Sequence, residues 1–259
     1  MTEDKDSGDA ILERQILAAK RKRAAIVARG SLLDFIRFIR PHPEFPDDTD
    51  QSAFEVTPVA RLLCEVMEKV ERGELLRACV SIPPQHGKSD VISRAFPAWA
   101  AGRNPHKHLM LGTYSQDFAE DFGGEVRNII NSSEFAQVFP HFGLRKGEKA
   151  KDTLVTTKGG KLNFLGRGGA GTGKPADTFL VDDPIKDDAE AQSPTIRKQV
   201  WGWFNKVAFS RIHKFSPVVI VHTRWHEDDL IGRLVDPSHP DHDKSIAKKW
   251  TYLNVPAVV

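Results

Sequence analysis

A chain of 259 residues with 40% hydrophobic and 28% charged residues has the size and composition of one large globular domain, or of a domain with a small appendage. The formal net charge of +2 is too small to indicate nucleic-acid binding by itself, so any contact with DNA has to come from a local patch. No apolar run reaches the ~18 residues of a transmembrane helix, so no membrane partner is predicted. The two cysteines and the acidic first residues, which do not resemble a signal peptide, favour a reducing cytoplasm.

Residues 1–50 are predicted to form a helical arm and a connector. Residues 10–27 are rich in good helix formers, and residues 31–39 read as a second helix that nearby prolines end. The basic cluster Lys20–Arg23 is either a solvated helix face or a contact with a partner subunit or a nucleic-acid backbone. Residues 51–259 are then expected to form the main domain.

Short apolar runs alternate with helical patterns from residue 57 onward. Thr57 is expected to cap a helix that starts at Pro58, and Pro97 is expected to end or bend the helix over residues 90–101. Short, nearly continuous apolar strands that alternate with helices are typical of a parallel sheet with helices on both faces. We therefore predict an α/β fold with a doubly wound, mainly parallel sheet and N-terminal helices. The predicted strands are residues 75–80, 107–113, 154–157, 161–165, 178–182, 217–222 and 250–255.

One stretch, from Ser81 to Asp90, has the layout of a nucleotide phosphate-binding loop: a strand, a tight turn, Gly-Lys-Ser and a helix. A turn at a helix N-terminus aims backbone N–H groups at one point, where the helix dipole adds positive potential. Gly87 would let the backbone approach the phosphates, Lys88 would reach the β- and γ-phosphates, and Ser89 would bind Mg²⁺. The residues assigned to nucleotide binding are Pro84, Gln85, His86, Gly87, Lys88, Ser89 and Asp90.

A rival phosphate loop lies downstream, at residues 168–175. It has both glycines of the standard GxxxxGK[ST] pattern, whereas Ile82 stands where the earlier stretch should have its first glycine. However, Pro175 offers no hydroxyl to a metal, and a strand rather than a helix follows it. We therefore place the phosphate site at Gly87-Lys88-Ser89; the alternative for that stretch is an ordinary loop with an exposed lysine.

The apolar strand over residues 178–182 ends in two carboxylates, Asp182 and Asp183. In a phosphate-loop NTPase we expect such a strand beside the loop's own strand, where its first carboxylate supports Mg²⁺ and a second can polarise the attacking water. Side chains alternate along a strand, so both carboxylates reach the metal only if the chain turns at the strand's end. The alternative is a plain strand followed by an Asp-Asp-Pro turn.

A third apolar strand ends at His222 and is followed by Thr223, which could sense the γ-phosphate from the carboxyl edge of the sheet. His222 and His226 raise the alternative of a zinc site, although a turn between them keeps the pair off one helical face. The acidic run at residues 227–229 more simply supplies the negative first turn of a helix through Leu234.

The glycine-rich loop from Arg167 to Lys174 has two readings. It is either a flexible connector or the source of a cation that reaches a phosphate, its own or a neighbour's.

Four stretches together resemble the ATPase domain of the large terminase subunit of tailed bacteriophages. They occur in that family's order and spacing, and the resemblance covers roughly residues 31–259. It implies a phosphate-loop NTPase fold of the ASCE type and an ATP-driven motor that moves viral DNA into a preformed capsid. The four stretches are residues 83–89, 171–177, 181–184 and 223–234.

By this resemblance, Lys88 and Ser89 bind ATP and Mg²⁺, Asp182 is the carboxylate on the Mg²⁺ side, and Asp183 takes the place of the catalytic acid. Thr223 lies in the motif that couples hydrolysis to movement, with Arg224 beside it. The chain departs from the family where Asp183 replaces the more widespread Glu.

A further departure concerns cations: Gln85 stands where many relatives have Arg, so Lys88 is the only cation in the loop. We therefore predict that a second cation completes a neighbour's site in a ring-shaped homo-oligomer. Arg167 is the first candidate because its planar fork suits phosphate. Lys174, where relatives often have Arg, is weaker, and Arg224 is the rival supplied within the same chain.

The resemblance also implies partners and a setting. The partners are double-stranded DNA, the portal protein and the small terminase subunit, and the setting is the host cytoplasm with transient docking on the viral procapsid. The family's C-terminal nuclease domain is not among these residues, and the apolar end at residues 256–259 is what we expect of a piece of a longer protein. The alternatives are a superfamily 2 helicase-like translocase and a non-hydrolysing nucleotide switch or DNA-binding adaptor.

Overall fold

The strands form one seven-stranded sheet in the order β3-β4-β2-β5-β6-β1-β7. The computed structural model of the chain describes residues 3–147, 150–169, 175–240 and 248–256. All neighbouring strands are parallel except β3, which runs antiparallel to β4 at one edge. This confirms the predicted mainly parallel sheet. The strands are β1 (Arg77–Ser81), β2 (His108–Thr113), β3 (Thr153–Val155), β4 (Lys161–Gly166), β5 (Thr178–Asp182), β6 (Val218–His222) and β7 (Thr251–Asn254).

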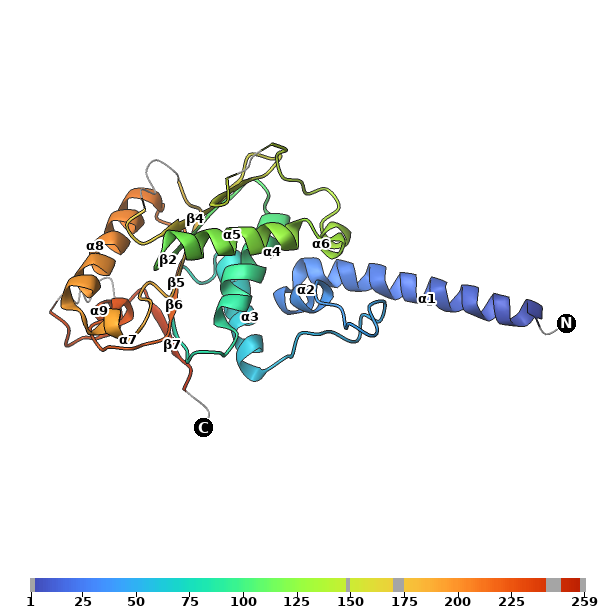
Figure 1. Cartoon of the computed structure of the whole chain (residues 1–259), viewed down its shortest axis with the longest axis horizontal. Helices are drawn as coiled ribbons and strands as arrows, with labels where there is room; N and C mark the ends of the chain where they lie inside the picture. The colour runs from blue at the N-terminus through green and yellow to red at the C-terminus, as the bar shows by residue number, and fades with distance from the viewer. Residues whose placement is uncertain (1–2, 148–149, 170–174, 241–247, 257–259) are drawn as a thin grey trace.

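Helices cover both faces of the sheet, as Figure 1 shows, with α3, α4 and α5 on one side and α7, α8 and α9 on the other. Their bounds are α1 (Glu3–Gly30), α2 (Leu32–Phe38), α3 (Pro58–Glu71), α4 (Phe96–Arg103), α5 (Gln116–Ile130), α6 (Ser133–Val138), α7 (Asp188–Gln192), α8 (Pro194–Arg211) and α9 (Leu230–Val235). The predicted cap of α3 is confirmed: the Thr57 hydroxyl accepts a hydrogen bond from the Ala60 N–H at 3.1 Å. Ser115 caps α5 in the same way.

The helix after the phosphate loop is irregular. Its first part, Asp90–Ala95, is π-helical, and the α-helix α4 begins at Phe96 with Pro97 in its first turn. Proline has no N–H with which to continue a helical hydrogen-bond ladder, so the change of helix type falls where the sequence predicted a break or bend.

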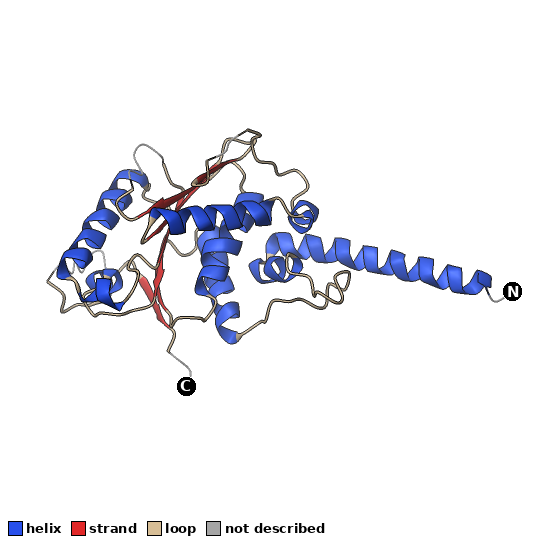
Figure 2. Cartoon of the chain, in the orientation of Figure 1, coloured by secondary structure: helices blue, strands red, loops and turns tan. Residues whose placement is uncertain are grey.

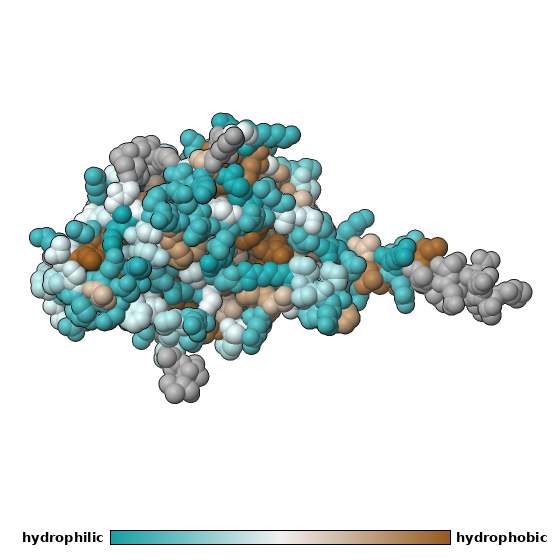
Figure 3. Space-filling view, viewed as in Figure 1, coloured by the Kyte–Doolittle hydropathy of each residue, from teal (hydrophilic) through white to brown (hydrophobic). Residues whose placement is uncertain are grey.

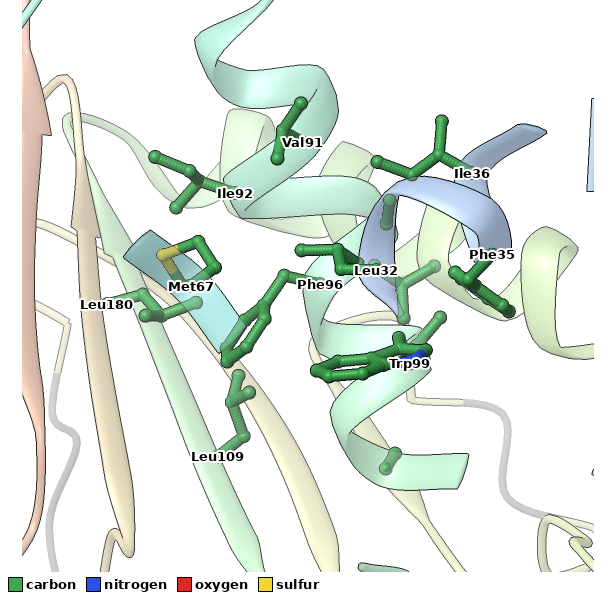
Figure 4. Close-up of a cluster of buried hydrophobic side chains, with 14 of the residues drawn as sticks. Leu32, Phe35, Ile36, Met67, Val91, Ile92, Phe96, Trp99, Leu109 and Leu180 are labelled. Atoms are coloured by element: carbon green, nitrogen blue, oxygen red, sulfur yellow. The ribbon is translucent and has the colours of Figure 1, made fainter. Parts of the chain in front are cut away.

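The two faces of the sheet carry separate hydrophobic cores. The core that contains α3, α4 and α5 also includes Leu32, Phe35 and Ile36 of α2, and Leu32 and Phe35 lie on the same side of Trp99 (Figure 4). The other core is built on Trp203 and neighbouring side chains of α8. From Ala25 onward, therefore, the N-terminal segment and the main domain share one core.

The remainder of α1 projects from the body as a single long helix (Figures 1 and 2). Ile11, Leu12 and Ile16 on it are each about half exposed, and apolar residues are visible along this arm in Figure 3. None of the helices that the structure describes is both long enough and apolar enough to cross a bilayer.

The order of the strands corrects one prediction. The strand that ends in Asp182 was expected beside the strand that precedes the phosphate loop, but β6 lies between β5 and β1. Since β6 carries Thr223 directly after its last residue, the inserted strand places that side chain between the loop and the two carboxylates.

If α2 is part of the main core, removing its largest buried side chain has to destabilise the whole domain. Phe35 is 0% exposed, whereas Phe45 in the connector is 49% exposed. We expect Phe35→Ala to lower the free energy of unfolding by about 3–5 kcal/mol and Phe45→Ala to change it little, as measured by urea unfolding. An equally small effect at Phe35 would show that α2 is a separate appendage.

Candidate nucleotide-binding site

Three chain segments leave the carboxyl ends of parallel strands at one edge of the sheet. The phosphate loop follows β1, the carboxylates Asp182 and Asp183 close β5, and Thr223 follows β6. Ligands of open parallel sheets bind at this edge. The structure thus brings together the three stretches that the sequence analysis singled out.

The phosphate loop turns through two residues with positive φ. Gly87 has φ 73°, a value that glycine adopts freely, whereas Gln85 has φ 62°, which is unusual for a residue with a side chain. The His86 ring bonds the Pro84 carbonyl at 2.7 Å, and the Val91 N–H donates to the Gly87 carbonyl at 3.1 Å. The loop is therefore held by hydrogen bonds of its own backbone and of the His86 ring.

Asp90, assigned to nucleotide binding, has another partner. Its carboxylate forms a two-pronged ion pair with Arg40, at the end of the segment that includes α2, and the Arg40 guanidinium stacks on the Phe54 ring. The Asp90 side chain therefore ties the N-terminal segment to the start of the helix that follows the phosphate loop.

Lys88 is the centre of the site. Its ammonium lies 3.0 Å from Asp183 Oδ2 and donates to the Thr223 hydroxyl at 3.2 Å. The Thr223 hydroxyl in turn donates to the Ile82 carbonyl at 3.2 Å, and the Thr223 N–H donates to Asp183 Oδ1 at 3.0 Å. Lys88 is 8% exposed, so this cation is held against the carboxylate with little water around it. One lysine thereby links the loop, β5 and β6.

The two neighbouring carboxylates have different surroundings because the chain turns between them. Asp183 has φ 41°, which takes its carboxylate to Lys88, whereas Asp182 is 0% exposed and accepts a hydrogen bond from the Ser93 hydroxyl at 2.6 Å. Burial, reinforced by the charge of Asp183, raises the pKa of Asp182 to about 6, although the Ser93 and Ser89 hydroxyls and Lys88 act in the opposite direction.

The Asp182 environment fits a magnesium ion. Among the described residues, Asp182 Oδ1 is a buried oxygen with no hydrogen-bond partner, and the Ser89 hydroxyl influences the same carboxylate. An all-oxygen donor set made of a carboxylate and a hydroxyl is what this hard cation prefers. In the described part of the chain, no three His, Cys, Asp or Glu side chains gather as a metal-binding group.

The segment after Thr223 is held by ion pairs. Arg224 donates to Asp229 Oδ2 at 2.7 Å and to the Glu227 carbonyl at 3.0 Å, while the other Asp229 oxygen caps α9 by accepting the Gly232 N–H at 2.7 Å. Gly232 is required here, because a Cβ on it would lie 1.8 Å from the Glu227 carbonyl oxygen. The acidic run was expected to form the first helical turn; instead α9 begins at Leu230, after Asp229.

Asp228 joins this segment to α8. Its carboxylate accepts hydrogen bonds from Arg197 at 2.9 Å, from Arg233 at 2.7 Å and from His239, whose ring lies 2.7 Å away. Burial opposes ionisation, but these three cationic or donor partners hold the pKa of Asp228 well below its usual range. The turn after Thr223 is therefore tied to α8 and α9.

Arg167, the first candidate for the second cation, is engaged within its own chain. Its guanidinium binds both oxygens of Glu190, at 2.9 and 3.0 Å, and donates to the Pro184 carbonyl at 3.1 Å. The Arg167 hydrogen bonds also hold the pKa of Glu190 below its usual value. The ion pair connects the end of β4 to α7, and the bond to Pro184 connects it to the turn that follows Asp183. Lys174 lies outside the described residues.

A hollow of about 340 Å³ opens beside the phosphate loop on the side of the N-terminal segment. Its walls come from residues 53–60, including Phe54, and from Gln85, His86, Gly87 and Val91. This hollow adjoins the point where the loop backbone is exposed.

Three side chains of the site region were not singled out from the sequence. Ser93 is one helical turn after Ser89, so a search one turn along the helix could have found it. Arg40 and Glu190 carried no such signal, because their partners Asp90 and Arg167 are 50 and 23 residues away in the chain. The zinc alternative gains no support: the His222 ring bonds the Thr223 carbonyl, and His226 Nδ1 accepts the Asp228 N–H.

Comparisons with known proteins are consistent with this arrangement. The family described as "Terminase large subunit, T4likevirus-type, N-terminal" matches residues 79–259. The fold is similar to that of the bacteriophage HK97 large terminase, with a TM-score of 0.53 and 14% identity over 83% of this chain and 42% of that one. It is also similar to the large terminase ATPase domain of Thermus phage P74-26, with a TM-score of 0.50 and 12% identity over 83% of this chain and 85% of that one. The chain thus spans less than half of the HK97 protein. No curated protein sequence matches it.

The raised pKa of Asp182 makes the stability of the folded chain depend on pH. An Asp carboxyl in an unfolded chain has a pKa of ~3.9, whereas the pKa of Asp182 in the folded chain is about 6. Between these two pH values the folded chain binds the proton more tightly than the unfolded chain does. The free energy of unfolding therefore falls as the pH rises through this window. The side chain of the Asp182→Asn variant stays neutral at every pH. We expect the free energy of unfolding of this variant to gain on the order of 1–3 kcal/mol relative to that of wild type between pH 4 and pH 7.

Urea unfolding in EDTA without nucleotide measures this difference. The matched control is Asp121→Asn, which removes an exposed carboxylate on α5 and is expected to follow the wild-type pH profile. Parallel profiles for wild type and Asp182→Asn would contradict the assigned burial of this carboxylate.

Proposed function

Because the chain belongs to the family of terminase large subunits, we propose that it is the ATP-hydrolysing motor domain of a viral DNA-packaging terminase, translocating double-stranded DNA into a procapsid. The observation that carries the proposal is the position of Lys88, which is held between Asp183 and Thr223 at the carboxyl edge of the sheet. The site thereby contains a cation for the γ-phosphate, Lys88, and a carboxylate for the attacking water, Asp183. The Thr223 side chain would detect whether Lys88 contacts Asp183 or the γ-phosphate.

ATP binding uses the loop and the hollow beside it. We place the phosphates over Gly87, Lys88 and Ser89, where backbone N–H groups and a helix N-terminus favour anions. The adenine would occupy the hollow beside Phe54, with Gln85 and His86 as its other wall. Asp90 supports the loop through Arg40 rather than by touching the nucleotide.

Asp182 and Ser89 would hold Mg²⁺, because they supply the unpartnered buried oxygen and the adjacent hydroxyl. When bound, the ion neutralises negative charge on the phosphates during transfer. Ser93 keeps the Asp182 carboxylate in position through its hydrogen bond to Oδ2.

Hydrolysis depends on separating Lys88 from Asp183. A γ-phosphate competes with Asp183 for the Lys88 ammonium, so ATP binding releases Asp183 Oδ2 from its ion pair. The free carboxylate oxygen can then accept a proton from water as the water oxygen bonds to the γ-phosphorus and the bond to ADP breaks. The proton remains on Asp183 until phosphate leaves.

Thr223 couples this exchange to the rest of the domain. Its hydroxyl and its N–H contact Lys88 and Asp183, respectively, and the turn that follows is tied by Arg224 to α9 and by Asp228 to α8. When Lys88 changes its partner, Thr223 loses or gains a contact, and the displacement passes to these two helices.

We propose that the motor works as a ring-shaped homo-oligomer in which Arg167 completes a neighbour's active site. An added arginine can accelerate phosphoryl transfer by about 10³–10⁵-fold. In the single chain Arg167 is bound to Glu190, so the ring contact has to exchange Glu190 for a phosphate. By the same proposal, the portal protein and the small terminase subunit are its partners, and the ring acts in the host cytoplasm, transiently docked on the procapsid.

Asp183→Asn tests the division of roles at the site. We expect the variant to bind ATP nearly as wild type does and to hydrolyse it about 10²–10⁴-fold more slowly, since the amide does not accept the proton. Lys88→Ala is the comparison, because it is expected to lose both binding and turnover. Phosphate release and nucleotide affinity are measured with DNA and the assembly partners present.

Two outcomes would contradict this division of roles. If wild type releases no phosphate under these conditions, the chain is a nucleotide switch. If Asp183→Asn loses nucleotide binding as strongly as it loses the rate of hydrolysis, Asp183 belongs to the metal site.

Mixed rings test the position of the second cation. Neither Arg167→Ala nor Lys88→Ala subunits are expected to hydrolyse ATP alone. In a mixture, some interfaces pair an intact loop with an intact Arg167, so a cation supplied by the neighbour predicts partial recovery of phosphate release. Mixtures of Arg224→Ala with Lys88→Ala are the matched control, because Arg224 is the candidate that acts within its own chain, where it is bound to Asp229, and should give no recovery across an interface. The absence of recovery with Arg167→Ala would remove this role.

A further inference from the structure

The antiparallel edge of the sheet carries an excess of positive charge. Between residues 144 and 161 the sequence has six Lys or Arg residues and two Asp or Glu residues, a net charge of +4 in a chain whose total is +2. The described cations there, together with the one before β2, define a basic edge surface. Its members are Lys107, Arg145, Lys146, Lys151, Lys158 and Lys161, and all six are exposed.

Backbone pairing places several of these cations side by side. The Arg145 N–H donates to the Val155 carbonyl at 2.8 Å, Val155 is opposite Lys161, and Lys161 is in register with His108 at the start of β2. Adjacent strands are about 4.8 Å apart, so Arg145 and Lys161 are separated by roughly 10 Å. Lys158 is in the turn between β3 and β4, and the Lys107 carbonyl accepts the Lys161 N–H.

These side chains have no partner in the described part of the chain: none of the six takes part in a side-chain hydrogen bond or an ion pair there. The arginines near the nucleotide site differ in this respect, since Arg40, Arg167 and Arg224 are each bound to a carboxylate. A group of exposed cations without counter-charges raises the local potential and attracts a polyanion.

The other basic cluster, on α1, is less available. Arg21 is bound to Gln137, Glu134 and the Pro46 carbonyl, and Lys20 lies 3.6 Å from Asp50. Only Lys22 and Arg23 of that cluster are exposed without such partners among the described residues. The cluster that the sequence analysis considered for nucleic-acid contact is therefore the weaker candidate.

We propose that the basic edge surface binds the phosphate backbone of double-stranded DNA. The inference rests on the proposed function, because a DNA-translocating motor requires a surface that holds the duplex and releases it along its length. Five of the six cations are lysines, which bind phosphates as point charges. Contacts to phosphates carry no sequence information, so we expect binding to be independent of DNA sequence. Five members of the surface lie at the amino ends of β2 and β4, and Lys151 lies beside the carboxyl half of β4, since the neighbouring Asp152 carbonyl accepts the Phe164 N–H. The nucleotide site lies at the carboxyl ends of strands of the same sheet.

Salt dependence of DNA binding tests the proposal. The full chain is titrated against a fluorescein-labelled 30-base-pair duplex between 50 and 200 mM salt, by anisotropy, with two unrelated sequences. Each lost phosphate contact reduces the slope of log K against log salt by about one. We expect the double variant Lys158→Ala, Lys161→Ala to bind both duplexes more weakly and to reduce the slope by about two. The matched control Lys22→Ala, Arg23→Ala removes the same charge from α1 and should leave both quantities unchanged.

The outcomes separate the two proposals. If wild type binds DNA and the Lys158, Lys161 variant keeps its affinity and slope, the surface is wrong while the motor proposal stands. If the α1 variant weakens binding instead, the DNA contact belongs to α1. If wild type shows no salt-dependent binding to either duplex at 50 mM salt, the DNA-translocating part of the proposed function fails together with the surface. Equal rates of DNA-independent phosphate release in wild type and variant exclude damage to the fold.

Discussion

The ion pair between Lys88 and Asp183 is the interaction on which the site depends. A nearly buried lysine without a counter-charge would be unfavourable, and the pairing with Asp183 at 3.0 Å satisfies it. The positive φ at Asp183 takes its carboxylate to Lys88, and β6 lies between β1 and β5. Only with β6 in that place does Thr223 contact both members of the pair.

A shared sheet connects this site with the surfaces proposed for DNA and for a neighbouring subunit. Strand β4 begins at Lys161 on the basic edge surface and leads at its other end into Arg167, which is bound to Glu190. The Arg167 N–H also donates to the Thr113 carbonyl at the end of β2, so the two strands are joined where they approach the nucleotide side. A shift of β4 along its axis under load from DNA would therefore act on the cation proposed to serve a neighbouring site. The Arg40–Asp90 pair ties the N-terminal segment to the phosphate loop in a similar way.

Local signals in the sequence were sufficient for the elements and for most of the site. The Gly-Lys-Ser turn, the apolar strand ending in two carboxylates and Thr223 after the next strand are each contained in a few consecutive residues, so spacing and residue type predicted their convergence. The order of the strands was wrong at one point, because it is set by which crossovers pack over the sheet and not by any single strand. The partners of Asp90 and Arg167 were also missed, since contacts between distant segments follow from the tertiary arrangement. The contact between Ser93 and the buried Asp182 was missed for the same reason, because it joins distant segments. However, Ser93 lies one helical turn after Ser89, and this spacing could have predicted that both hydroxyls face the same carboxylate.

The most direct measurement is a crystal structure of the chain with Mg²⁺ and a non-hydrolysable ATP analogue. The account predicts that the Lys88 ammonium leaves Asp183 Oδ2 for the γ-phosphate, that Asp183 Oδ2 then faces a water molecule, and that Asp182 and Ser89 lie at the metal. A nucleotide bound elsewhere, such as at residues 168–175, with Lys88 still paired to Asp183, would contradict it.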